Sequence, residues 1–294
     1  MVDTGSTVPR RQLGRYLREL RQQSGLTLVE VARRIERGVS TVQRLEAGRA
    51  DNIRLADIEA LCQVLGASET ETAALKGLAQ QGNARSWWHQ YNDLIPANFD
   101  VYMGLESAAQ ELTLFQELIP GLMQTADYFR ALLRAARPNE IDTEISRRVE
   151  MRMHRQALMA RRAQAATLDM ILDESALHRV IGSRRIMAAQ LRHLADAGTQ
   201  PDATIRILPY SAGVPLGDLT GPFIILDFGE GIVDQPLEPS VVYVESYTGA
   251  MYFDDEDNVE RYRAAHEALR RVALDGQRSR DLLRQAAREY ERER

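Results

Sequence analysis

This sequence of 294 residues has one cysteine, one lysine and no long apolar run. The single cysteine, Cys62, cannot form an intramolecular disulfide or supply a zinc cluster. No stretch approaches the roughly 18 apolar residues that a membrane-spanning helix needs, and residues 1–20 lack the apolar core of a secretory signal. Because 44% of the residues are hydrophobic, the chain can form a core rather than remain disordered. We expect a folded, cytoplasmic protein with no membrane partner.

Charge is distributed unevenly along the chain. Residues 1–50 contain ten arginines against five acidic residues, a net charge of +5, whereas residues 51–294 contain 27 basic and 37 acidic residues, a net charge of −10. A basic segment on an acidic remainder suggests that only the first part contacts a polyanion. An ordinary scatter of surface charge is the other interpretation that the composition allows.

Residues 10–80 have the pattern of five short helices. The second helix opens with a capping box at residues 27–30, in which a threonine and a glutamate each bond to the other's backbone amide. A similar capping box at residues 68–71 opens the fifth helix. The third helix covers about residues 39–47 and ends at a glycine. We therefore predict an all-α domain over residues 1–82.

The rest of the chain mixes helices and strands. Residues 83–97 are interpreted as a junction, in which Trp87 and Trp88 either pack between domains or line a pocket. Residues 98–294 are predicted to form a larger mixed domain. Its expected strands are 167–172, 204–208, 223–228, 241–244 and 250–253. Its expected helices are 102–117, 125–136, 142–162, 174–181, 184–197, 258–274 and 279 to near the end. The predicted fold class is α+β, with about five strands in the second domain.

The second and third helices have the spacing of a DNA-binding helix-turn-helix. A capped helix, a short turn and a helix ending in Leu-Glu-x-Gly follow one another within about 22 residues. The DNA major groove, about 12 Å wide, admits one α-helix, and the preceding helix holds it there. Residues 26–50, LTLVEVARRIERGVSTVQRLEAGRA, resemble the XRE family of phage-repressor-like regulators, and the resemblance covers residues 10–66. A helical hairpin that only packs is the alternative.

The resemblance implies that residues 39–46 form the recognition helix. Arg44 could donate a bidentate pair of hydrogen bonds to guanine, and Gln43 could pair with adenine. Flanking residues such as Arg49 are better placed for phosphate. The residues implied to contact DNA are Thr27, Arg37, Val39, Ser40, Thr41, Gln43, Arg44, Arg49 and Asn52.

Two positions depart from the XRE pattern. Leu28 follows the cap of the second helix, where the family usually has a glutamine that contacts phosphate. Glu36 stands at the position of the family's turn glycine, and Gly38 comes two residues later. Because residues 40–43 also form a capping-box pattern, the recognition helix could begin at Val39 or later.

The second domain has a resemblance of its own, carried by four motifs that follow one another along the chain. These are LESAA at 105–109, LIPGLMQT at 118–125, LDESAL at 172–177 and VVYVE at 241–245. They resemble the C-terminal domain of the WhiJ-like, antitoxin-like group of actinobacterial XRE regulators. The resemblance implies a partnership with a small protein encoded nearby, and roles in development or antibiotic production.

Catalytic and metal-binding motifs are missing from the sequence. The five histidines have no metal-ligand spacing, and residues 254–257, Asp-Asp-Glu-Asp, lack the ligand spacing of an EF-hand. Those carboxylates are better explained by the positive end of the helix that follows. Cys62 lies on an apolar helix face and is interpreted as core. We expect no enzymatic activity, no catalytic residue, no cofactor and no metal.

Two functions remain open from the sequence. The first is a DNA-binding regulator, more specifically a repressor, whose C-terminal domain dimerises and binds a small partner protein. The alternative is a regulator gated by a small molecule bound in that domain. One recognition helix reads only a few base pairs, so we expect a homodimer on a palindromic operator. The apolar face of the last helix, with Leu282, Leu283 and Ala286, is the first expected dimer contact.

Overall fold

The computed structural model describes residues 8–50, 52–83, 90–91, 93–95, 97–160, 166–229 and 238–292. The chain divides into two compact units, one made of Met1–Ala108 with Gly231–Glu238 and the other of Ala109–Glu230 with Pro239–Arg294. We call residues 8–83 the head and the second unit the sheet domain. The expected junction residues Trp87 and Trp88 lie outside the described residues.

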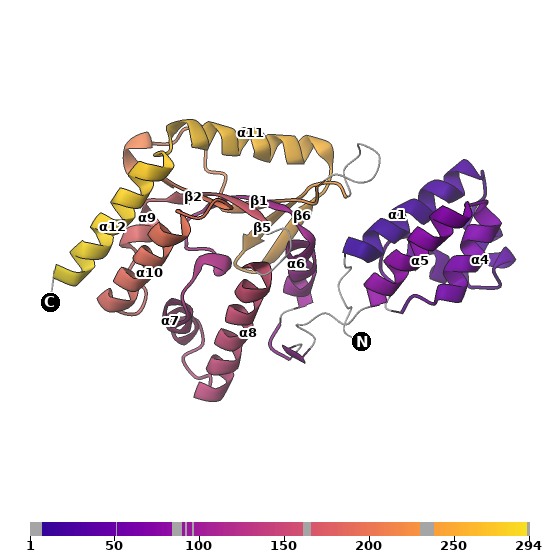
Figure 1. Cartoon of the computed structure of the whole chain (residues 1–294), viewed down its shortest axis with the longest axis horizontal. Coiled ribbons are helices and arrows are strands. Elements are labelled where there is room, and N and C mark those ends of the chain that lie inside the picture. The colour runs from indigo at the N-terminus through magenta and orange to yellow at the C-terminus, as the bar shows by residue number, and fades with distance from the viewer. Residues whose placement is uncertain are drawn as a thin grey trace. The chain divides into compact units, whose positions relative to one another are not determined.

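Five helices build the head, as the sequence predicts (Figure 1). They are α1 Val8–Gln23, α2 Leu28–Arg34, α3 Val39–Glu46, α4 Leu55–Leu65 and α5 Glu69–Asn83. Their apolar faces meet in one core that includes Leu13, Val31 and Ile58. Cys62 belongs to this core, and burial raises the pKa of its thiol. Both capping boxes form, with Ser68 and Glu71 exchanging hydrogen bonds at the start of α5.

Six strands form one mixed sheet in the sheet domain, which confirms the α+β fold class. Its strands are β1 Glu111–Gln116, β2 Thr167–Asp173, β3 Ala203–Leu208, β4 Phe223–Asp227, β5 Val241–Ser246 and β6 Gly249–Phe253. Their order is β3-β2-β1-β4-β5-β6. β1 runs parallel to β2, and β2 parallel to β3. The pairs β1–β4, β4–β5 and β5–β6 are antiparallel.

The strand that the sequence did not predict is β1, at the centre of the sheet. The predicted helix over residues 102–117 is wrong, because α6 (Ala97–Ala108) ends at Ala108 and β1 begins at Glu111. Residues 112–115 are all buried, because both faces of a central strand are covered, and Leu112, Leu114 and Phe115 make them a short, mostly apolar run. Such a run cannot be distinguished from a buried helix by periodicity. The five predicted strands are all present.

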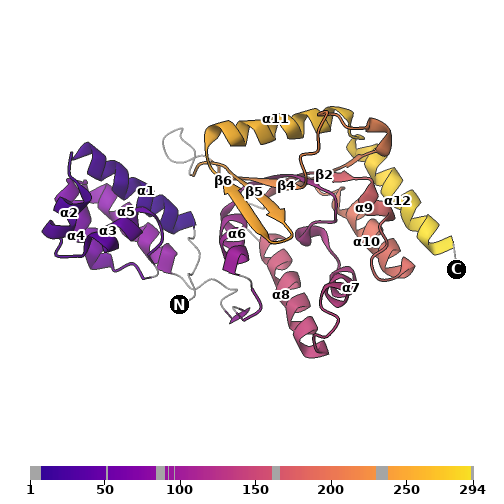
Figure 2. The same ribbon diagram turned by 180° about the vertical axis from the view of Figure 1, so that it is seen from behind.

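Helices cover both faces of the sheet (Figures 1 and 2). The helix α11 lies along one face, and α10 lies on the other, with α7 and α8 beyond it. The helices of this domain are α7 Ala126–Ala136, α8 Asp142–Ala160, α9 Ser175–His178, α10 Arg184–Ala197, α11 Glu256–Val272 and α12 Gly276–Arg292. Asp255 caps α11 by accepting from the amide of Asn258, which confirms the predicted role of that acidic cluster. No helix among the described residues is long and apolar enough to cross a membrane.

The last helix, α12, packs against α10 within the same domain. Leu283 is fully buried and Ala286 is 4% exposed in the single chain. The apolar face that the sequence offered as the first dimer contact is therefore already occupied by the protein's own core. The prediction of a dimer contact at these two side chains is wrong.

The LIPGLMQT motif contains a short 3-10 helix, Gly121–Met123, and glutamine side chains hold it. Gln190 of α10 accepts from the amide of Thr125 through Oε1 at 2.6 Å and donates to the carbonyl of Met123 through Nε2 at 2.7 Å. Gln156 of α8 donates to the carbonyl of Gly121 at 2.7 Å. A carboxamide both donates and accepts, so it can satisfy backbone groups that a single 3-10 turn and a helix N-cap leave without partners. The motif therefore fixes α8 and α10 to one segment.

Replacing Gln190 by leucine tests this description. Gln190→Leu keeps the side-chain size but leaves the Thr125 amide and the Met123 carbonyl without partners, and should destabilise the sheet domain by about 2–4 kcal/mol. Gln200→Leu, at an exposed position beyond the same helix, should change stability by less than about 0.5 kcal/mol. Urea unfolding of both variants measures the difference. An equal loss of stability in the two variants would mean that the hydrogen bonds of Gln190 do not stabilise the sheet domain.

Candidate nucleic-acid interface

The turn between α2 and α3 contains a residue in an unusual conformation. Glu36 has φ of 54° and is the one non-glycine with positive φ in the described ranges. The amide of the next residue, Arg37, bonds back to the carbonyl of Ala32 at 2.9 Å, which closes the end of α2. Glycine adopts this left-handed conformation at lower cost. Glu36 therefore occupies the site at which the XRE pattern has its glycine.

The recognition helix begins at the earlier of the two predicted starts. Gly38 is the N-cap of α3, and its carbonyl accepts from the amides of Thr41 and Val42. No side chain caps this helix start, so the capping-box pattern at residues 40–43 does not shift the helix. The register implied by the resemblance is therefore retained.

One face of α3 is buried and the other is open to solvent. Val42, Leu45 and Glu46 are buried, whereas Gln43 and Arg44 are exposed. The remaining predicted contacts lie on or near the open face: Val39, Ser40, Arg49 and Asn52 are exposed and Thr41 is half-buried. The structure thus supports the outward positions that the sequence indicates.

A hollow of about 170 Å³ brings part of this set together. Thr41, Arg44 and Asn52 line it. Arg54 also lines it and was not among the DNA contacts predicted from the sequence. Arg54 is the N-cap residue of α4 and is exposed. No local pattern in the sequence marks it, because its closeness to Thr41 depends on the position of α4. Within the described part of the head, Arg44, Arg49 and Arg54 form no ion pair with a carboxylate, which leaves their guanidinium groups available to a polyanion.

Two of the predicted DNA contacts also have structural partners. The Thr27 hydroxyl donates to Glu30 Oε2 at 2.8 Å, and the Thr27 amide donates to the same oxygen at 2.9 Å, which lowers the pKa of Glu30. Arg37 donates to Asp57 Oδ1 from Nε at 3.0 Å and from Nη2 at 2.7 Å, and this carboxylate raises the pKa of Arg37. Arg37 therefore joins the turn to α4. Its phosphate contact stays a prediction.

The end of the recognition helix is fixed to α1. Glu46, 7% exposed, accepts from Arg21 Nε at 2.6 Å and from Arg21 Nη2 at 2.9 Å. A second arginine, Arg18, donates to the Glu46 backbone carbonyl at 3.2 Å. A Cβ atom at Gly14 would lie 2.6 Å from the carbonyl oxygen of Leu45, so α1 approaches α3 at a distance that only glycine allows. These contacts explain the glutamate of the Leu-Glu-x-Gly motif.

Two family models match the chain. Residues 12–75 match a model described as a helix-turn-helix domain, and residues 99–285 match one described as a domain of unknown function (DUF5753). No curated protein matches. The first match confirms that the head is a helix-turn-helix domain, as its geometry indicates.

Two glycine substitutions test the packing of α1 on α3. Gly14→Ala places a methyl group against the Leu45 carbonyl and should destabilise the head by about 1–3 kcal/mol, with weaker DNA binding because α3 must move. Gly77→Ala, in the interior of α5, meets no atom within 4 Å and should stabilise the head by about 0.5–1 kcal/mol. Thermal unfolding and DNA-binding anisotropy of the full chain measure both. The same sign for the two variants would contradict this account.

Proposed function

The chain belongs to the family described as a domain of unknown function (DUF5753), and we propose that it is a cytoplasmic, sequence-specific transcriptional repressor without enzymatic activity. The helix-turn-helix match supports a DNA-binding regulator. The observation that carries the proposal is the recognition helix α3, whose polar face is exposed while Glu46 fixes its other side to α1. A helix held this way can enter the major groove without losing its own support.

In this proposal Arg44 and Gln43 read base edges, and Arg49, Arg54 and Asn52 hold the phosphate backbone. The exposure of all five side chains supports the assignment. The three arginines, which form no ion pair within the described residues, add positive charge next to α3, and Arg44 and Arg49 belong to the basic segment of residues 1–50.

The protein acts as a homodimer on a palindromic operator in this proposal, since one helix reads too few base pairs alone. The contact belongs to the sheet domain. With α12 occupied, the exposed apolar side chains of the loop after β3 offer a surface: Tyr210 is 60%, Val214 55% and Leu219 81% exposed. Exposed apolar groups gathered in one segment are typical of interaction sites.

The likeness to WhiJ-like, antitoxin-like actinobacterial regulators supports a further element of the proposal. A small protein encoded nearby would bind the sheet domain, at the same loop or beside it. A second candidate function, gating by a small molecule, is supported by a cavity of about 400 Å³ under α11.

The salt dependence of DNA binding tests the proposed function. Genome-wide mapping of bound DNA supplies the site, and fluorescence anisotropy of the full chain measures affinity. A dimer that neutralises about 6–10 phosphates should lose roughly 10³-fold or more in affinity between 50 and 200 mM salt. Binding that is insensitive to salt, or that persists when Arg44, Arg49 and Arg54 are all replaced by alanine, would contradict the proposal.

Two arginines should differ in what they contribute. Arg44→Ala should cost about 1–3 kcal/mol on the mapped site and relax preference at one base pair, because a bidentate contact to guanine is lost. Arg49→Ala should weaken binding to mapped and scrambled duplexes alike and reduce the salt slope by about one. Competition with scrambled duplex separates the two. Discrimination that depends on Arg49 instead would reverse the assignment.

A further inference from the structure

The sheet face beneath α11 changes from apolar to polar along the strands. Phe115 of β1 and Ile171 of β2 belong to the apolar core that packs against α11. Because side chains alternate along a strand, Thr113 and Asp169, two residues earlier, face the same helix. These two residues are partners in the β1–β2 register. A polar pair therefore continues an apolar layer under one helix.

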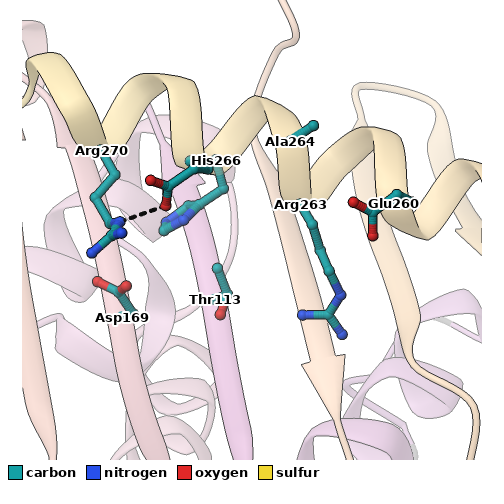
Figure 3. Close-up of a pocket in the computed structure, with 8 residues that line it drawn as sticks. Thr113, Asp169, Glu260, Arg263, Ala264, His266 and Arg270 are labelled. Atoms are coloured by element: carbon teal, nitrogen blue, oxygen red, sulfur yellow. Dashed lines mark hydrogen bonds and ion pairs between the residues drawn. The ribbon is translucent and has the colours of Figure 1, made fainter.

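A cavity of about 400 Å³ lies at this polar end. Figure 3 shows His266 and Arg270 pointing from α11 toward the strands that carry Thr113 and Asp169, while Arg263 points toward the sheet further along the helix. Its one apolar lining residue is an alanine of α11, and none of the lining residues is a phenylalanine, tyrosine or tryptophan. The volume falls in the range of small-molecule sites, while the lining disfavours a flat aromatic ligand.

His266 is the buried group in this lining. It is 5% exposed, and its Nε2 has no hydrogen-bond partner in the described part of the chain. Burial lowers the pKa of His266, so the ring is neutral at pH 7 and offers one donor and one acceptor. A buried polar atom without a partner costs about 1–3 kcal/mol, and such a group in a cavity wall indicates a missing partner.

Most charges around the cavity are already paired. Arg263 donates to Asp227 at 2.5 Å, and Arg270 donates to Glu267 at 2.7 Å. Asp169 accepts from Arg206 at 2.5 Å. Glu260, by contrast, forms no ion pair with any described residue. One carboxylate is thus left without a cation at the edge of a polar cavity.

We propose that the cavity under α11 binds a small hydrophilic amine that also carries hydroxyl groups, the chemistry of an amino sugar. The ammonium group pairs with Glu260, which supplies the uncompensated negative charge. Hydroxyl groups donate and accept at once, so they suit the mixture of Asp169, Thr113 and the His266 imidazole. The inference rests on the proposed function, because it names the ligand class that would gate a DNA-binding regulator.

Calorimetric titration of the full chain with D-glucosamine tests the site, with D-glucose as the neutral match and putrescine as an amine without hydroxyls. D-glucosamine should bind saturably below about 10 mM, and both other probes about tenfold more weakly or worse. Glu260→Gln should weaken D-glucosamine binding about tenfold. Glu256→Gln makes the same charge change on the same helix outside the cavity lining and should leave binding unchanged. His266→Phe should abolish binding, and circular dichroism checks that this variant folds.

Three results would overturn the inference: no saturable D-glucosamine binding, equal binding of D-glucose or putrescine, or equal effects of Glu260→Gln and Glu256→Gln. Affinity for the mapped DNA site is measured on the same samples. Amine binding without DNA binding would contradict the proposed function but not the assignment of the cavity. DNA binding without amine binding would contradict the assignment of the cavity but not the proposed function.

Discussion

The ion pair between the Glu46 carboxylate and Arg21 is the interaction on which the position of the recognition helix depends. An isolated helix of eight residues is not stable in water, so α3 takes its position from its neighbours. Two hydrogen bonds from Arg21 hold Glu46, and Gly14 lets α1 come close to the helix end. The same turn of helix buries Leu45 in the core. The exposed side of α3 can therefore carry residues chosen for DNA, because the buried side alone fixes the helix.

Local signals in the sequence predicted the head well. The capping boxes at residues 27–30 and 68–71 involve atoms within one turn, so residue types alone specify them. The Arg37–Asp57 pair joins the turn after α2 to α4, and nothing in the local pattern indicated it. The same limit explains why Arg54 was missed, since its closeness to Thr41 appears only once α4 is placed.

The largest error of the sequence-based prediction was the missed strand β1, because its strand pairing is non-local. Its apolar run gains strand partners only from residues 167–173 and 223–227, far along the chain. Without those partners a helical continuation of α6 is the simpler reading of the pattern. The cavity under α11 was invisible for a similar reason. Thr113, Asp169 and His266 are widely separated in sequence, and only the sheet register and the packing of α11 bring them around one cavity.

Two ion pairs that connect elements of the head, Arg21–Glu46 and Arg37–Asp57, have guanidinium groups as their cations. This limits the ways in which these contacts could be broken in a cell. Arg21 and Arg37 each hold a carboxylate, and those carboxylates raise the pKa of both side chains. An arginine keeps its charge at any pH a cell reaches, and acetylation targets lysine instead. The one lysine, Lys76, pairs with the exposed Glu59 away from these contacts. Neither a change of pH within the cellular range nor lysine acylation would therefore remove the charge of the arginines that hold these contacts.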